Sequence, residues 1–240
     1  MNQIRLEINC DLGEGVENEE SIIPLIDAAS IACGGHFGNE KTIHNTVKAC
    51  IHSGKKVGVH PSYPDQENFG RKSLSIAIPV LLESIHKQIE LFIKVATDSG
   101  AQMDHIKFHG ALYNDAAAKP KLARSLCEFL AENYPKIPLF VPPGSIIETI
   151  SKELKIPIRL EIFGDRAYTD SLQLVSRNQE NAVFTDIKAI FSHLEPILEE
   201  SKIRTQSGKM ILVNAETICF HGDNPGILSF LPQVRKRWWS

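Results

Sequence analysis

Apolar residues recur along the chain with two spacings, every second position in short runs and every third or fourth position in longer ones. The first spacing is typical of strands and the second of amphipathic helices. Strands are predicted in seven segments, which are 4–11, 28–33, 56–61, 105–110, 138–141, 156–163 and 210–220. Helices are predicted between them in segments 19–27, 39–54, 79–100, 120–130, 146–154 and 187–197. Two further short β-like pieces are expected within 172–186.

The alternation of strands and helices predicts a parallel sheet with right-handed crossovers. An open, doubly wound sheet fits the same alternation. A closed ring fits better, because polar residues follow nearly every strand and a barrel mouth brings all strand ends to one pocket. We therefore predict an irregular seven-stranded α/β barrel of the TIM-barrel type. No linker or low-complexity tract divides the chain, so residues 1–240 are expected to form a single domain.

The composition of the chain mainly argues against certain classes of function. The chain has 240 residues and a net charge of −3, which offers no electrostatic argument for binding nucleic acid or an anionic membrane. No apolar run approaches the roughly 18 residues of a membrane span, and no signal peptide is expected before the first strand. The five cysteines are dispersed, without a CxxC pair, and are expected to be reduced core thiols in a cytoplasmic protein.

Polar and charged residues stand at the predicted carboxyl ends of the strands. They are Asp11, His36, His60, Lys107, His109, Asp165, Arg166, His221 and Asp223. A single histidine at a strand end is more often a satisfied core group than a functional one. Here the motif of an apolar residue, a histidine and a chain reversal occurs three times, at 59–61, 108–110 and 220–222. Metal sites and proton shuttles use imidazole, whereas structural turns do not need it.

Asp11, His60 and His109 form a reasonable ligand set for a catalytic divalent ion, since two imidazoles and a carboxylate leave open coordination positions. Without a metal, the same groups would act as acids and bases. Lys107 could hold a carboxylate or phosphate, or extend past the rim into solvent. Asp165 and Arg166 could orient a substrate carboxylate or form an ordinary ion pair.

Standard nucleotide and hydrolase motifs are absent from the sequence. It contains no GxxxxGK[ST] loop, no GxGxxG after a strand, no HExxH and no GxSxG. We therefore expect that this chain alone does not hydrolyse ATP.

Taken together, several sequence blocks resemble the LamB/YcsF family, known as the A subunit of 5-oxoprolinase. The blocks are NCDLGE at 9–14, IACGGH at 31–36, VHP at 59–61, YPD at 63–65, FGR at 69–71, KFHGALYN at 107–114, DRAY at 165–168 and ICFHGDN at 218–224. They follow the family order over nearly the whole chain. The chain departs from the family at Asn39, where aspartate is usual, and at Phe108, where proline is usual.

The resemblance implies a barrel related to the polysaccharide-deacetylase-like group. It also implies the ATP-dependent opening of 5-oxo-L-proline to L-glutamate, in a complex with subunits B and C. Phosphorylating the amide oxygen would convert it into a good leaving group, and the cationic groups would offset the developing negative charge.

The resemblance also implies roles for individual residues. The implied catalytic residues are Asp11, His36, His60, Lys107, His109 and Asp165. The implied substrate-binding residues are Asn9, Glu14, Arg71, Tyr113, Arg166, His221 and Asp223. Two other classes of function remain open, a stand-alone metal-dependent amidase or deacetylase and a non-catalytic lactam-binding subunit.

Overall fold

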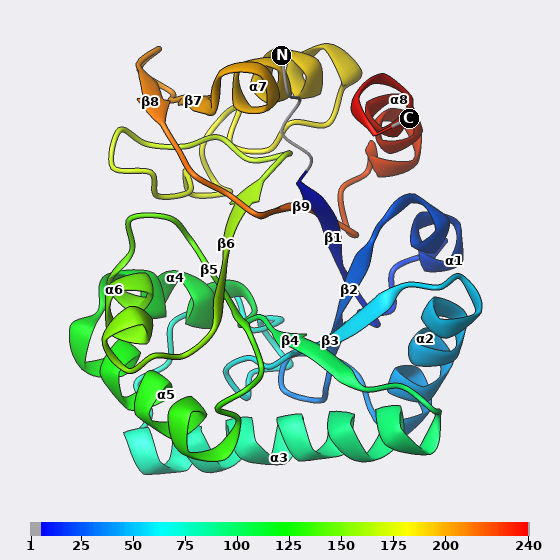
Figure 1. The fold of residues 1–240 in the computed structure, drawn as a ribbon, viewed down its shortest axis with the longest axis vertical. Helices are drawn as coiled ribbons and strands as arrows, with labels where there is room; N and C mark the ends of the chain where they lie inside the picture. Colours follow the sequence, from blue (N-terminus) through cyan, green and yellow to red (C-terminus); the bar gives the residue numbers. More distant parts are fainter. Residues whose placement is uncertain (1–5, 240) are drawn as a thin grey trace.

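Seven parallel strands close into a barrel in a computed structural model that describes residues 6–239. Helices surround the ring (Figure 1). The barrel strands, in ring order, are β1 (Glu7–Leu12), β2 (Ala28–Ala32), β3 (Lys56–His60), β4 (Met103–Ile106), β5 (Leu139–Val141), β6 (Ile158–Phe163) and β9 (Thr217–His221). This confirms the predicted α/β barrel. The alternation predicted from Ile4 begins outside the described residues.

The helices follow the predicted pattern with two additions, α4 and α8, which were not predicted. The full set of helices among the described residues is α1 (Glu19–Ile22), the 3-10 helix η1 (Ile23–Leu25), α2 (Glu40–His52), α3 (Ile78–Asp98), α4 (Gly110–Ala118), α5 (Pro120–Asn133), α6 (Ile146–Glu153), α7 (Ile187–Glu200) and α8 (Ile227–Trp238). Asn39 begins α2 as predicted, because its side chain accepts hydrogen bonds from the backbone of Lys41 and Thr42.

The predicted strand at 210–220 is wrong as a single element. Gly208 has a positive φ of 87° and lies in a tight turn. The turn folds β8 (Met210–Leu212) back onto β7 (Lys202–Arg204) as an antiparallel pair outside the barrel. Only the later part, β9, enters the ring.

The predicted strand at 105–110 ends earlier, at Ile106. Lys107 still donates a backbone hydrogen bond to Val59 of β3, and His109 donates one to Pro61, just after the end of β3. The β3–β4 register shifts between Val57 and Val59. Gly110 then begins α4 directly, so His109 lies at the junction of strand and helix.

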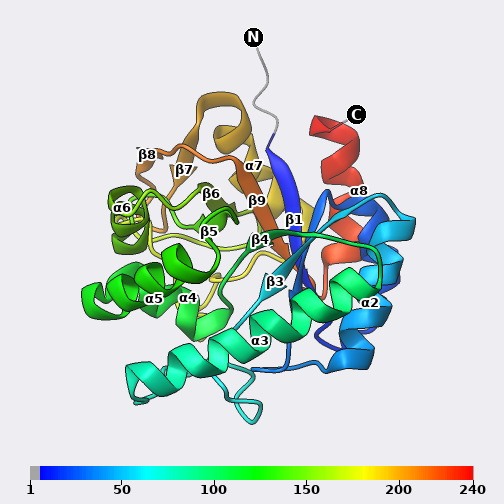
Figure 2. The same cartoon turned by 60° about the horizontal axis from the view of Figure 1, so that its bottom comes forward.

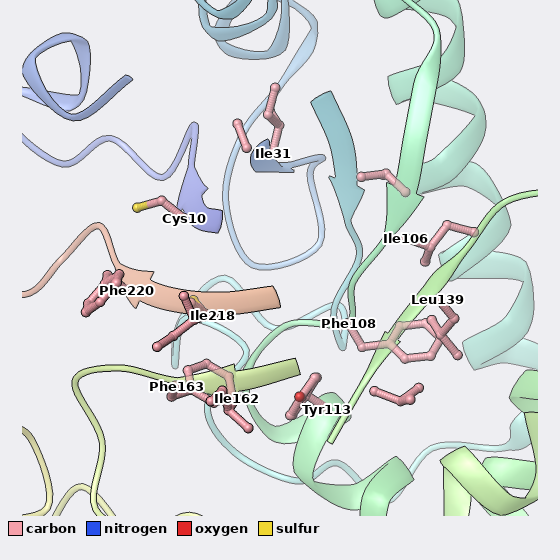
Figure 3. Close-up of a cluster of buried hydrophobic side chains, with 14 of the residues drawn as sticks. Cys10, Ile31, Ile106, Phe108, Tyr113, Leu139, Ile162, Phe163, Ile218 and Phe220 are labelled. Carbon is pink, nitrogen blue, oxygen red and sulfur yellow. The ribbon is translucent and has the colours of Figure 1, made fainter. Parts of the chain in front are cut away.

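The barrel strands carry apolar side chains toward the helices and polar side chains toward the barrel axis. Figure 3 shows part of the apolar layer, in which Cys10, Ile162, Ile218 and Phe220 lie among other buried side chains. Many residues one position away on the barrel strands face inward and are polar, although Phe163 and Cys219 also lie on this side, near Lys107. The fully buried inward set includes Asn9, Ser30, His105, Glu161 and Thr217. The barrel interior is therefore built from hydrogen bonds as well as from apolar packing.

Within residues 6–239, each helix is too short or too polar to cross a membrane. All five cysteines are buried and free, as expected from their dispersed positions in the sequence.

Candidate functional site

A cavity of about 650 Å³ opens at the carboxyl ends of the barrel strands. Small-molecule sites commonly have roughly 300–1,000 Å³. Most of the predicted site residues line this cavity, and they are Asp11, Glu14, His60, Arg71, Lys107, His109, Tyr113, Arg166, His221 and Asp223. Asn9, His36 and Asp165 lie behind its wall and are almost fully buried.

Asp11 and Glu14 reach the cavity floor from the end of β1 and the loop that follows it. Glu19, in the first turn of α1, accepts hydrogen bonds from the backbone N–H groups of Gly13 and Glu14, at 2.9 Å each. These bonds hold the loop against the start of the helix. Burial by itself would raise the pKa of Asp11, but the charges of His60 and Lys107 hold it well below its usual value.

His60 and His109 face each other, as the strand-end pattern predicted. His109 Nδ1 lies 3.0 Å from His60 Nε2, and His60 Nε2 lies 3.5 Å from Asp11 Oδ2. His60 Nδ1 is 2.8 Å from the carbonyl of Lys107, and His109 Nε2 is 2.9 Å from the carbonyl of Phe69. Because a carbonyl only accepts, both of those nitrogens carry the hydrogen. The two remaining ring nitrogens, His60 Nε2 and His109 Nδ1, therefore face each other beside Asp11.

A close approach of two loops orients His109. Gly110 has a positive φ of 54°, and a side chain there would meet the carbonyl oxygen of Gly70 at 2.7 Å. The loop after β3 thus lies directly against the start of α4, which brings the Phe69 carbonyl to His109.

His36 completes a compact group with Glu14 and His109. Their ligand atoms all lie within 4.8 Å of one another. His36 Nε2 is 2.9 Å from Glu14 Oε1, and its ring stacks on that of His109 with centroids 3.7 Å apart. Burial lowers the pKa of His36 to about 4, despite the hydrogen bond to Glu14, so its imidazole is neutral near pH 7. This group shares only His109 with the predicted metal set.

Lys107 crosses the barrel interior and is 1% exposed. Its Nζ lies 2.7 Å from Asp11 Oδ1 on β1 and 3.1 Å from Glu161 Oε1 on β6. The alternative that the Lys107 side chain extends past the rim into solvent is therefore wrong. Burial would lower the pKa of Lys107, but Asp11, Cys219 and Glu161 together raise it well above the usual value.

Glu161 was not among the predicted site residues, although it is fully buried and contacts Lys107. Its Oε1 also accepts a hydrogen bond from Asn9 Nδ2 at 2.9 Å. The signal was a charged residue at position 161, two residues after Arg159 and therefore on the same face of the strand. Nearby, the buried hydroxyl of Tyr113 lines the cavity and has no hydrogen-bond partner among the described residues.

Asp165 holds neighbouring groups in place from behind the cavity wall. Its carboxylate accepts hydrogen bonds from His221 Nδ1 at 2.8 Å and from Asn224 Nδ2 at 2.9 Å. Burial would raise the pKa of Asp165, but these donors and the His221 charge lower it. The ordinary ion pair between Asp165 and Arg166, one of the two alternatives, is not present among the described residues.

Arg166 fixes the loop between β6 and α7. Its guanidinium donates to the carbonyls of Ala182 at 3.2 Å and Val175 at 2.6 Å. These are its side-chain hydrogen bonds among the described residues, so Arg166 holds the backbone of the loop.

Comparison with known proteins agrees with this architecture. Residues 6–239 match the model of the LamB/YcsF family. The chain belongs to the LamB/YcsF family. The A subunit of 5-oxoprolinase from Bordetella pertussis is 32% identical over 235 residues, which covers 96% of this chain and 93% of the relative.

Solved structures support the same fold. The lactam utilization protein of Thermus thermophilus is 28% identical, with a TM-score of 0.89, and the match covers 98% of this chain and 97% of that one. A GH18 chitinase from Pseudoalteromonas aurantia has a TM-score of 0.54 at 12% identity, over 96% of this chain and 99% of that one, so it resembles this family member in fold alone.

Proposed function

We propose that this chain is the lactam-binding and ring-opening component of an ATP-dependent 5-oxoprolinase, which converts 5-oxo-L-proline to L-glutamate and hydrolyses ATP. The relatives named as the A subunit of 5-oxoprolinase and the lactam utilization protein support the substrate class. The single observation that carries the proposal is the convergence of Asp11, His60 and His109 beside a buried lysine on the floor of the cavity.

In this proposal the lactam carbonyl lies over the cavity floor. His60 or Asp11 takes a proton from the attacking water, because both face the cavity and lie 3.5 Å apart. The ammonium of Lys107 offsets negative charge that develops on the carbonyl oxygen. With the lactam oxygen phosphorylated by ATP, the ring C–N bond breaks after the water adds, and the ring nitrogen gains a proton and becomes the amine of glutamate. A second water then releases phosphate from the acyl phosphate and leaves the side-chain carboxylate.

The residues also fit a divalent ion. Two neutral imidazoles and a carboxylate are suitable ligands, and the Phe69 carbonyl orients His109 as outer partners orient metal-bound histidines. On the floor, Asp11, Glu14 and Glu161 contribute three carboxylates against one ammonium, leaving an excess of two negative charges. An ion held by Glu14, His36 and His109 would polarise the lactam carbonyl and lower the pKa of a bound water.

ATP and the partner chains complete the proposed reaction. The relatives are named as one subunit of an enzyme, which supports an assembly of several chains, and we propose the family's B and C subunits as the others. The buried free cysteines are consistent with the proposed cytoplasmic location.

Glutamate formation from 5-oxoproline and ATP tests the proposal, measured with this chain alone, with subunits B and C alone, and with all three. We expect glutamate only from the complete mixture, and no phosphate release from ATP by this chain alone. Full activity from B and C without this chain would overturn the proposal.

A stand-alone metal-dependent amidase is the second candidate, because the compact group of Glu14, His36 and His109 requires no phosphate donor. Ring opening by this chain without ATP, abolished by a chelator and restored by a divalent ion, would favour that function instead.

A further inference from the structure

Three loops meet at the mouth of the cavity through one carboxylate. Asp223, after β9, accepts hydrogen bonds at the same oxygen, Oδ2, from Arg71 Nη2 and from Arg177 Nη1, the latter at 3.1 Å. Arg71 belongs to the loop after β3, and Arg177 to the loop after β6. All three residues line the cavity. Arg177 was not among the predicted site residues.

The cluster of Arg71, Arg177 and Asp223 has unused capacity for an anion. Each guanidinium has five N–H donors, and each gives one hydrogen bond to Asp223. Two positive charges face one negative charge, and the side chains of the two arginines are 42% and 32% exposed. Guanidinium groups bind carboxylates through paired hydrogen bonds, so the two arginines have donors for a second carboxylate.

Contacts other than Asp223 hold the side chain of Arg71 and the loop that carries Arg177. The Arg71 guanidinium lies 4.9 Å from the centroid of the Phe69 ring, and the Phe69 carbonyl is bonded to His109. Arg177 follows Val175, whose carbonyl accepts a hydrogen bond from Arg166. The pair is therefore prepared for a ligand, and Arg166 positions the loop that carries Arg177.

The shape of the lactam agrees with this placement. Its carboxylate is attached to the ring carbon on the far side of the nitrogen from the carbonyl. When the carbonyl lies over the floor, at Lys107 and His109, the carboxylate points toward the mouth.

We propose that Arg71 and Arg177 together bind the substrate carboxylate, and that Asp223 occupies their donors until the substrate arrives. This inference rests on the proposed function, because it assumes a lactam in the cavity. It identifies Arg177 as a residue that selects lactams bearing a carboxylate over those without one.

Calorimetric titration of the purified chain tests the proposal with three probes: 5-oxo-L-proline, 2-pyrrolidinone, which lacks the carboxylate, and inorganic phosphate. Arg177→Ala should weaken 5-oxo-L-proline binding about tenfold to a hundredfold, the effect of losing a charge-assisted contact. Its affinity for 2-pyrrolidinone should not change. Arg177→Lys should recover part of the loss.

Arg124→Ala is the matched control, because Arg124 forms a similarly exposed ion pair with Glu153 on the outer helices. It should leave both affinities unchanged. Asp223→Asn should tighten 5-oxo-L-proline binding, since it removes the competing carboxylate. The thermal unfolding midpoint of each variant shows whether it is folded.

The outcomes separate this inference from the proposed function. Equal affinity of the wild-type chain for 5-oxo-L-proline and 2-pyrrolidinone would overturn the carboxylate pair and leave the lactam site standing. Binding of neither lactam would overturn both. If Arg177→Ala weakened only phosphate binding, the pair would serve a phosphoryl group and the inference would be wrong. Weaker binding by Asp223→Asn would refute the displacement of Asp223.

Discussion

Replacing Lys107 by methionine should strongly destabilise the protein, because Lys107 is the cation between two buried carboxylates. Its Nζ contacts Asp11 and Glu161, which are 6% and 0% exposed. Methionine keeps most of the apolar volume and removes the charge. Removing one partner of a buried ion pair costs about 3–5 kcal/mol. In a chain of this size that loss lowers the unfolding midpoint by about 6–20 °C.

The dependence on pH gives the prediction a second readout. The pKa of Lys107 is raised, so its contribution is fully present below the unfolded lysine pKa of about 10.4 and is lost only as the pH rises through the folded value. In Lys107→Met the carboxyl groups of Asp11 and Glu161 lose the cation that stabilises their charged forms. Protonation of these carboxyl groups removes the cost of burying an unpaired charge. The difference in free energy of unfolding between wild type and Lys107→Met should therefore become smaller from pH 7 to pH 5.

Urea unfolding of wild type, Lys107→Met and the double variant Lys107→Met/Glu161→Gln measures these effects. The added Glu161→Gln change should restore about 0.5–3 kcal/mol, the usual coupling between contacting residues. Lys87→Met is the control, because Lys87 forms an exposed pair with Glu83 that contributes little. A cost below about 1 kcal/mol for Lys107→Met, or a gap that does not change with pH, would refute the reasoning.

Three further predictions concern the floor and the opposite end of the barrel. Asp11→Asn should lower turnover of the assembled enzyme by about a hundredfold or more while the chain stays folded, as glutamate formation and circular dichroism would show; near-normal turnover would exclude Asp11 from the reaction. Metal analysis should find a divalent ion in wild type and in the control His86→Ala but not in His109→Ala, and equal content in all three would argue against the ligand set. Burial would raise the pKa of Asp104, but hydrogen bonds that include those from Arg159 hold it well below its usual value. Asp104→Asn should therefore be less stable than wild type at pH 7, with a gap that narrows as the pH falls below about 4; a constant gap would contradict the assignment.

The sequence was sufficient to predict the barrel and the convergence of its strand ends. Apolar alternation that stops at a polar residue locates a strand end locally, and parallel strands place all such ends on one rim. The meeting of His60 and His109 followed from that rule. Helix α8 was not predicted, although its apolar residues Ile227, Phe230, Val234 and Trp238 lie at helical spacing.

What the sequence could not supply was the pairing of side chains across the ring. Glu161 contacts Lys107 because β4 and β6 lie on either side of β5, a relation set by strand order and barrel diameter. Likewise, Glu14 lies on a loop, and its distance to His36 depends on how Glu19 closes that loop. Arg177 stands in an irregular segment with no periodicity to indicate where it points.

The ring closes where β1 pairs with β9, two strands far apart in the sequence, with Asn9 opposite Cys219 (Figure 2). During synthesis on the ribosome, β1 is made long before β9. Asp11 and Lys107 therefore stay exposed until β9 pairs with β1 and buries them. Such long-range closure is slow compared with local helix formation. The ability to bind a ligand should therefore appear in one late step of folding. A lactam or metal bound by the nascent chain would report that its barrel has closed.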